Sequence, residues 1–191
     1  MGNSKKKGLS KQELDHLRKS THFNHQELLL LYSQFLKENP SGIIQKSQFK
    51  TISKQLGIED PFVGELLFKN FDENGDGEIS FSELITAMSI TSRGSTDEKL
   101  EFLFNIYDLD GNGFIERDEI HQIFKSLHNI SIQDNELNDE KALISYVDQA
   151  FDEADQDKDG ALSLDEFKSK AKSDPKFLKS LNPFTSETEF K

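Results

Sequence analysis

The sequence predicts an all-α protein built from four helix–loop–helix units that associate in two pairs. Three features of the chain lead to this prediction. A twelve-residue segment with oxygen-bearing side chains at alternate positions occurs three times, starting at Asp72, Asp108 and Asp155. A segment of similar shape but different chemistry begins at Lys37. Apolar residues at helical spacing flank these segments, as amphipathic helices require.

The segment from Asp108 to Glu119 shows the chemistry most clearly. Carboxylate or amide oxygens stand at its first, third, fifth, ninth and twelfth positions, and Gly113 fills the sixth. Ca²⁺ is a hard cation that takes roughly six to eight oxygen ligands, so a short loop must wrap around it. Glycine permits the sharp turn, and the seventh residue offers its backbone carbonyl, which leaves the side chain of Phe114 free to be apolar. This spacing is that of an EF-hand calcium loop.

The other two acidic segments repeat the pattern. A single match could be a solvated acidic turn, but three full matches in one chain argue against that interpretation. We therefore expect three Ca²⁺ sites, each closed by a Glu that supplies two oxygens. The predicted ligands are Asp72, Asn74, Asp76, Glu78 and Glu83 in one loop, Asp108, Asp110, Asn112, Phe114 and Glu119 in the next, and Asp155, Asp157, Asp159, Ala161 and Glu166 in the last.

The segment from Lys37 to Gln48 keeps the shape of an EF-hand loop without its ligands. Gly42 and Ile44 hold the sixth and eighth positions, but a cation stands at the first position and Gln48 replaces the closing Glu. We expect a structural role, because a lone EF-hand leaves the apolar faces of its helices uncovered. Paired loops should join through a short antiparallel β bridge at their eighth residues. Ile44 should face Ile79, and Ile115 should face Leu162.

Composition limits the class of protein. The chain of 191 residues has a net charge of −12, and 15 of its 35 acidic residues lie in the three acidic loops. Three bound Ca²⁺ would reduce the net charge to −6, so the acidity favours cations and argues against nucleic acid as a partner. The lack of Cys excludes a disulfide framework and fits a reducing cytosol, where we expect the protein to be.

Residues 1–23 are expected to form a basic tail and a short helix. Gly2 after Met is the acceptor that N-myristoylation requires, although Lys6 stands where Ser or Thr is usual. Two interpretations stay open: a plain basic tail, or a lipid anchor assisted by Lys5, Lys6 and Lys7. In the second case the protein would lie peripherally on the cytoplasmic face of membranes through myristoyl-Gly2.

The remaining boundaries follow from helix signals. Residues 24–92 should form the first EF-hand pair and residues 97–172 the second. In the short joint between them, Gly94 can end one helix, and Thr96 or Asp97 can cap the next. Residues 128–140 are interpreted as an exposed loop within the second pair. Residues 173–191 should hold a short helix from Lys176 to Leu181 and a loose tail.

Several stretches resemble the neuronal calcium sensors, most closely those of the frequenin type: Phe35 to Gly42, Thr91 to Gly94, Asp97 to Leu100, Tyr107 to Asp110, and Asp174-Pro175. The resemblance covers nearly the whole chain, including the disabled first loop. It implies an N-myristoylated peripheral membrane protein that binds Ca²⁺, exposes an apolar groove and docks an amphipathic helix of a target. The targets that it implies include phosphatidylinositol 4-kinase and receptor regulators. The charged C-terminal end around Phe184 departs from the aromatic tail usual in this family.

We expect a calcium sensor in which binding tilts the outgoing helices and opens a groove. Two other classes stay open: a calcium buffer that barely opens, and a calcineurin B-like regulatory subunit of a phosphatase, against which the disabled first loop speaks. No enzyme is expected, since the chain shows no nucleophile–base set and no phosphate-cradling glycine loop. The candidate groove residues, each with plain core as the alternative, are Leu31, Phe35, Phe49, Ile52, Phe68 and Phe81.

Overall fold

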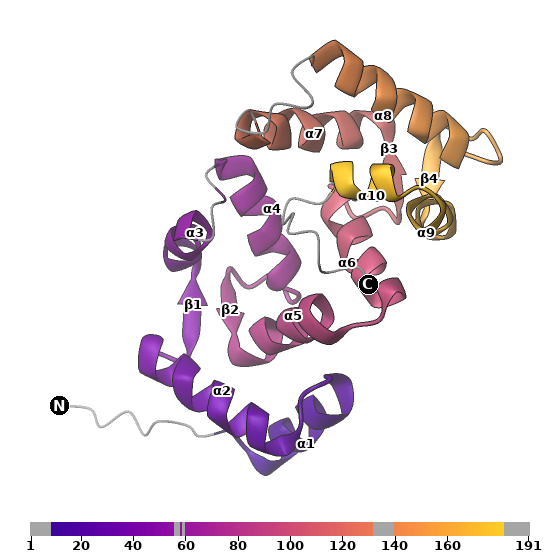
Figure 1. The fold of residues 1–191 in the computed structure, drawn as a ribbon. Coiled ribbons are helices and arrows are strands. Elements are labelled where there is room, and N and C mark those ends of the chain that lie inside the picture. Colours follow the sequence, from indigo (N-terminus) through magenta and orange to yellow (C-terminus); the bar gives the residue numbers. More distant parts are fainter. Residues whose placement is uncertain (1–8, 56–57, 59, 132–139, 182–191) are drawn as a thin grey trace.

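The computed structural model describes residues 9–55, 58, 60–131 and 140–181. Over these residues the fold is mostly helical with two small antiparallel sheets, which confirms the predicted class. Figure 1 shows α1–α5 grouped around one sheet and α6–α10 around the other. The elements are α1 (Lys11–Ser20), α2 (His25–Glu38), β1 (Ile43–Gln45), α3 (Lys46–Gln55), α4 (Pro61–Phe71), β2 (Glu78–Ser80), α5 (Phe81–Arg93), α6 (Thr96–Tyr107), β3 (Phe114–Glu116), α7 (Arg117–Ser131), α8 (Glu140–Ala154), β4 (Ala161–Ser163), α9 (Leu164–Ser173) and α10 (Pro175–Leu181).

Two sequence predictions concern residues outside the described ranges. Gly2, the expected lipid acceptor, and the tail around Phe184 both lie there. Within the described ranges, no helix has both the length and the apolar character that crossing a bilayer requires.

The two β bridges have the predicted register. Ile44 pairs with Ile79 between β1 and β2, and Ile115 pairs with Leu162 between β3 and β4. All four side chains are buried, so each bridge is also a point where the cores of two EF-hands meet. The disabled first loop is therefore retained as the structural partner of the second.

Helix starts are specified by a repeated local device. A Ser or Asn at the N-cap accepts from the third helical N–H, while a Glu at that third position bonds back to the N-cap N–H, which is a capping box. One boundary prediction was wrong here: α6 is capped by Ser95 with Glu98, not by Thr96 or Asp97. The other pairs are Ser10 with Glu13, Asn24 with Glu27, Ser80 with Glu83, and Ser163 with Glu166.

Gly94 ends α5 as predicted, but for a reason other than a left-handed turn. Its φ of −61° is available to any residue. A Cβ at this position would lie only 2.4 Å from the carbonyl oxygen of Ile90, so glycine is required by a close approach of the backbone. A second boundary also differs from the prediction, because α7 continues to Ser131, three residues past the expected start of the loop, and residues 132–139 lie outside the described ranges.

The candidate groove residues mostly belong to the core. Phe35, Phe49, Phe68 and Phe81 are buried, and Leu31 and Ile52 are partly buried against the same cluster. Ring contacts fix them: the centroids of Phe35 and Phe81 lie 5.5 Å apart, as do those of Phe49 and Phe68. In this conformation these side chains therefore form part of the core, which is the alternative that the sequence left open for each of them.

The C-terminal helix α10 closes the second EF-hand pair. Phe177 and Leu181 are fully buried, and the ring of Phe177 packs against that of Phe167 in α9. The hydroxyl of Tyr107 donates to the backbone carbonyl of Leu181 at 2.9 Å. Asp174 starts the helix by accepting the N–H of Phe177 at 3.0 Å, so the predicted short helix from Lys176 to Leu181 is confirmed, beginning one residue earlier.

Candidate metal centres

Each acidic loop begins where its incoming helix ends. The N–H groups of Asp72, Asp108 and Asp155 still bond to helical carbonyls four residues earlier, at 2.8–2.9 Å. The helix thereby holds the first carboxylate of each loop in a fixed position. All three carboxylates are buried, which is unusual for an Asp without a cationic partner.

The third loop gathers its carboxylates around one point. Oδ1 of Asp108 accepts the N–H groups of Gly111 and Asn112, and Oδ2 accepts the N–H of Gly113 at 2.9 Å. Oxygens of Asp108, Asp110 and Glu119 all lie within 4.8 Å of one another. Three like charges at this separation repel strongly, so the arrangement favours a divalent cation among them.

The fourth loop has the same convergence and an additional signal. Oxygens of Asp155, Asp157 and Asp159 lie within 4.8 Å of one another. Oδ2 of Asp155 accepts the N–H of Gly160 at 3.2 Å, whereas its Oδ1 is buried without any hydrogen-bond donor. A buried carboxylate oxygen without a partner is costly, and a hard cation would satisfy it. The residues present therefore fit Ca²⁺.

The second loop holds its residues in the same order with fewer converging charges. Asp72 accepts the N–H groups of Asp76 and Gly77, at 3.1 and 2.8 Å. An amide, Asn74, occupies the third position and accepts the N–H of Asp76 at 2.8 Å. Among the described residues, only the third and fourth loops bring three carboxylates within 4.8 Å.

The closing Glu of each loop joins the start of the loop to the exiting helix. Oε2 of Glu83, Glu119 and Glu166 accepts the N–H of the ninth loop residue, three positions earlier, at 2.8–2.9 Å. Oε1 accepts an N–H from the second or third loop residue, as in the 2.8 Å bond from Gln156 to Glu166. The hydroxyl and the N–H of Ser163 also hold the pKa of Glu166 below its usual value. A ligand that displaced these bonds would act on both ends of the loop.

Glycine at the sixth position adopts the left-handed backbone that the turn demands. The φ angles are +83° at Gly77, +88° at Gly113 and +90° at Gly160. The fourth residue of each acidic loop also has a left-handed backbone. In the second and third loops this residue is glycine, whereas in the last loop it is Lys158, with φ of +63°. This lysine is the only non-glycine residue with positive φ in the described part of the chain.

The first loop shows what remains when the ligands are removed. Oε1 of Gln48 accepts the N–H of Gln45 at 2.9 Å, which is the bond that a closing Glu makes elsewhere. Gln48 therefore keeps the helix start but brings no charge. Lys37 stands exposed at the first position, in contrast to the buried Asp of the other loops. The loop has the fold of a calcium site without its chemistry.

Contacts between distant segments surround the loops, and sequence reasoning missed them. Lys69 of α4 donates to the backbone carbonyl of Leu109 in the third loop at 2.6 Å. Arg117 and His121 of α7 both pair with Asp148 of α8, at 2.9 and 2.8 Å. No spacing rule marks these pairs in the sequence. In contrast, the role of Ser80 and Ser163 as helix caps was visible in the Ser-x-x-Glu spacing.

Comparisons with known proteins agree with this geometry. Residues 97–172 match the family model of the EF-hand domain pair, and residues 65–91 match that of the EF hand domain. The chain is 45% identical over 122 residues to calcium-binding protein NCSA of Dictyostelium discoideum, covering 64% of this chain and 66% of the relative. It is 43% identical to S-modulin of Aquarana catesbeiana and 40% identical to recoverin of Homo sapiens, each over 129 residues that cover 66% of this chain and 64% of the relative. The match thus spans slightly less than two thirds of these relatives.

The fold and the loops define an EF-hand calcium-binding protein. Within that class, all three relatives are members of the neuronal calcium sensor family, which confirms the resemblance predicted from the sequence. The relatives are calcium-binding sensor proteins and not enzymes, in agreement with the expectation of no catalytic site.

Proposed function

We propose that the chain is a calcium sensor that binds Ca²⁺ through three EF-hand loops and regulates target proteins through apolar surface that opens on binding. The observation that carries this proposal is the position of the closing Glu residues. Each bridges the beginning of its loop and the first turn of the exiting helix. Any rearrangement of the loop is thereby transmitted to a helix that packs on the core.

The ligand sets are those expected from spacing. In each loop, the side chains of the first, third, fifth and twelfth residues and the carbonyl of the seventh would hold the ion. Bound Ca²⁺ supplies a double positive charge that lets several carboxylates approach one another. The second loop brings the fewest carboxylates together, and we propose that it is the weakest of the three sites. Binding constants of EF-hand sensor loops span about 10⁻⁷–10⁻⁵ M.

The chain can convert loop closure into exposed apolar surface because its helices share one core. The Phe side chains of α2, α3, α4 and α5 pack against each other across the first pair. Tilting α5, the helix that leaves the second loop, would separate the rings of Phe35 and Phe81 and uncover them. A ligand shifts such an equilibrium only by its differential affinity for the two states.

The partners follow from the family. We propose that an amphipathic helix of a target protein occupies the opened surface in the helix-in-groove manner. Phosphatidylinositol 4-kinase and receptor regulators are the candidates that the resemblance suggests. A myristoyl group on Gly2, with the basic residues after it, would hold the protein at the cytoplasmic face of membranes. The intact mass of protein made in a eukaryotic cell would report this lipid.

The test uses an apolar fluorescent dye and a calcium titration on the full chain. A sensor should bind the dye much more strongly when Ca²⁺ is bound, and the increase should be lost when Glu83, Glu119 and Glu166 are all changed to Gln. The matched control changes Glu73 to Gln and Asp118 and Asp165 to Asn, which removes one exposed charge from each of the same loops at positions that supply no ligand. Uptake of Ca²⁺ without any change in dye binding would identify a buffer and refute the sensor.

A further inference from the structure

Helix α3 carries positive charge in a strongly acidic chain. Its sequence, from Lys46 to Gln55, contains Lys46, Lys50 and Lys54 and no acidic residue, whereas the chain as a whole has a net charge of −12. The spacing of four residues places these three lysines on one side of the helix. None of the calcium ligands described above lies on this helix.

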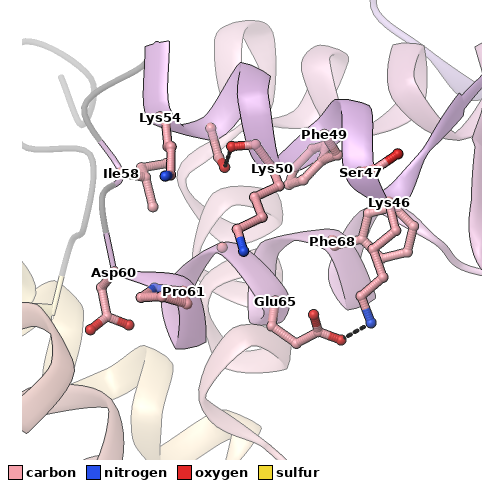
Figure 2. A pocket seen from close by; sticks show the side chains of 12 residues that line it. Lys46, Ser47, Phe49, Lys50, Lys54, Ile58, Asp60, Pro61, Glu65 and Phe68 are labelled. Atoms are coloured by element: carbon pink, nitrogen blue, oxygen red, sulfur yellow. Dashed lines mark hydrogen bonds and ion pairs between the residues drawn. The ribbon is translucent and has the colours of Figure 1, made fainter.

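This basic face borders a cavity between α3 and α4. The cavity has a volume of about 240 Å³. Figure 2 shows the side chains of Lys46 and Lys50 extending from α3 toward α4. Phe49, Ile58 and Phe68 contribute apolar walls, and all three are buried. The cavity therefore combines a cationic rim with an apolar interior.

The charges at the rim are not all neutralised. Lys46 forms an ion pair with Glu65 of α4. Asp60 uses its carboxylate to cap α4, accepting the N–H groups of Phe62 and Val63 at 2.8 and 3.0 Å. Lys50 and Lys54 form no ion pair with any residue in the described ranges. Two exposed ammonium groups thus remain available beside the cavity.

We propose that this cavity binds a phosphate monoester whose organic part enters the apolar interior. Two ammonium groups one turn apart can contact one phosphate, and charge-assisted bonds of this kind are among the stronger ones. The carboxylate of Asp60 already occupies the N-terminus of α4 on the same rim, so the lysines of α3 and not this helix end would hold the phosphate. An α-helix about 10 Å wide cannot enter a cavity of this size, so the occupant is a small organic phosphate or a lipid headgroup.

The site can be tested apart from the calcium loops. The full chain, kept free of Ca²⁺ with a chelator, is titrated with glycerol 3-phosphate and inorganic phosphate while amide NMR shifts are followed. In a parallel arm it is sedimented with phosphatidylcholine vesicles with or without phosphatidic acid. Binding to the soluble esters alone would indicate a free metabolite, and additional binding to phosphatidic acid vesicles would indicate a lipid; either supports the site.

Three variants separate a built site from surface charge. Lys50→Gln with Lys54→Gln should weaken binding roughly tenfold or more, since each charge-assisted bond contributes more than about 1.4 kcal/mol. Lys11→Gln with Lys19→Gln removes the same charge from exposed positions on α1 and should leave binding unchanged. Gly64→Leu keeps every charge but adds a side chain toward Ser53, whose Oγ lies 3.5 Å from a Cβ at residue 64.

The outcome for Gly64→Leu decides between the two explanations. Loss of phosphate binding in this variant, with an unchanged circular dichroism spectrum, supports the cavity. Three results would each overturn the proposal. The first is phosphate binding that persists in Gly64→Leu, and the second is an equal loss of phosphate binding in the α1 control variant. The third is a titration of the wild type in which the amide signals of α3 and α4 do not shift. If Gly64→Leu does not fold, Gly64→Ala with the smaller obstruction takes its place, and the lysine pair remains an independent test.

Discussion

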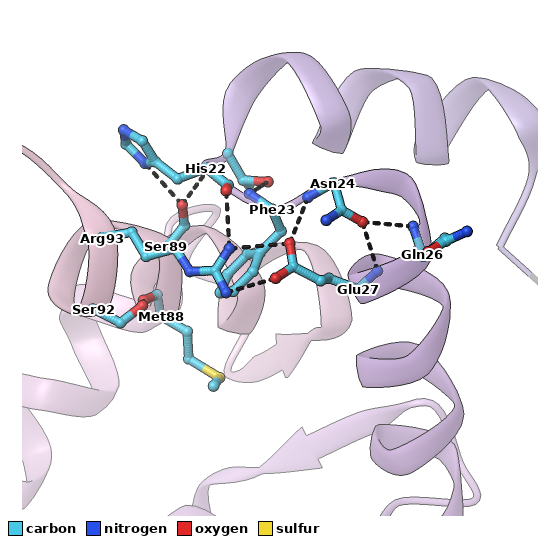
Figure 3. Close-up of polar contacts among 10 residues, drawn as sticks. His22, Phe23, Asn24, Gln26, Glu27, Met88, Ser89, Ser92 and Arg93 are labelled. Atoms are coloured by element: carbon cyan, nitrogen blue, oxygen red, sulfur yellow. Dashed lines mark hydrogen bonds and ion pairs between the residues drawn. The ribbon is translucent and has the colours of Figure 1, made fainter.

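Arg93 forms two parallel hydrogen bonds with Glu27, joining the end of α5 to the first turn of α2. The Nη2–Oε1 distance is 2.7 Å and the Nη1–Oε2 distance is 3.0 Å. The guanidinium also lies over the ring of Phe23, 4.5 Å from its centroid. Figure 3 shows this group beside the contact of His22 with Ser89, which ties the same turn to α5. The α1–α2 hairpin is thereby attached next to the short joint between the two EF-hand pairs.

This pair predicts an acid-sensitive contribution to stability. The hydrogen bonds from Arg93 and from the N–H of Asn24 lower the pKa of Glu27 from 4.5 to about 2. A carboxyl with a depressed pKa contributes stability that is fully present above pH 4.5 and is lost as the pH falls toward 2. Glu27→Gln should therefore be less stable than wild type at neutral pH, and the difference should shrink below pH 4.5. Urea unfolding at a series of pH values measures this, and a constant difference would contradict the assignment.

Tyr107→Phe should destabilise the second EF-hand pair by about 1 kcal/mol. The variant removes the buried hydrogen bond to the carbonyl of Leu181 and leaves that carbonyl unsatisfied. Burial raises the pKa of Tyr107 well above its usual range, so the hydroxyl stays a donor at any accessible pH. Tyr146→Phe is the matched control, because the Tyr146 hydroxyl is buried without a hydrogen-bond partner and its removal should cost little. Denaturant unfolding and hydrogen exchange of α10 are the measurements; equal effects of both variants would argue against the bond.

Lys158→Gly should stabilise the fourth loop. A non-glycine residue in the left-handed region costs about 1–2 kcal/mol, which exceeds the roughly 0.5–1 kcal/mol of extra chain entropy that glycine loses on folding. We expect a net gain of about 0.5 kcal/mol in calcium-free protein. The reciprocal change, Gly111→Lys at the same position of the third loop, should be destabilising. Thermal unfolding of both variants tests the reasoning, and a gain from Gly111→Lys would refute it.

The three sites should differ in affinity in the order that their carboxylates predict. Glu83→Gln removes a ligand from the second loop, which brings the fewest charges together, and should abolish the weakest calorimetric binding step. Glu119→Gln and Glu166→Gln should each abolish a tighter step. The ranking would be wrong if Glu83→Gln removed the tightest of the three.

Local patterns explain why much of this fold was predictable. The spacing of the ligands fixes the eighth residue of each acidic loop, and Gly42 at the sixth position fixes it in the first loop, so Ile44 was expected to meet Ile79 and Ile115 to meet Leu162. Pairing then places four apolar residues in two small sheets. The N-cap at Ser95 could also have been predicted from the sequence, because Glu98 stands three residues later and completes a capping box.

Contacts across the molecule were not predictable from spacing. Phe49 and Phe68 look the same in the sequence whether they line a groove or fill a core, and only packing decides between the two. The bond from Lys69 to the third loop depends on how α4 lies against it. The cavity beside Lys50 likewise exists only because α3 and α4 face one another.

The central claim is that three loops bind Ca²⁺ while the first does not, and the amide of the sixth glycine in each loop reports this. Gly77, Gly113 and Gly160 donate to the first Asp of their loops, at 2.8, 2.9 and 3.2 Å, whereas Gly42 donates to the carbonyl of Asn39. In an NMR titration at micromolar Ca²⁺ with physiological Mg²⁺, the first three amide signals should shift strongly and that of Gly42 should not. Unmoved signals at residues 77, 113 and 160, or a comparable shift at Gly42, would contradict the account.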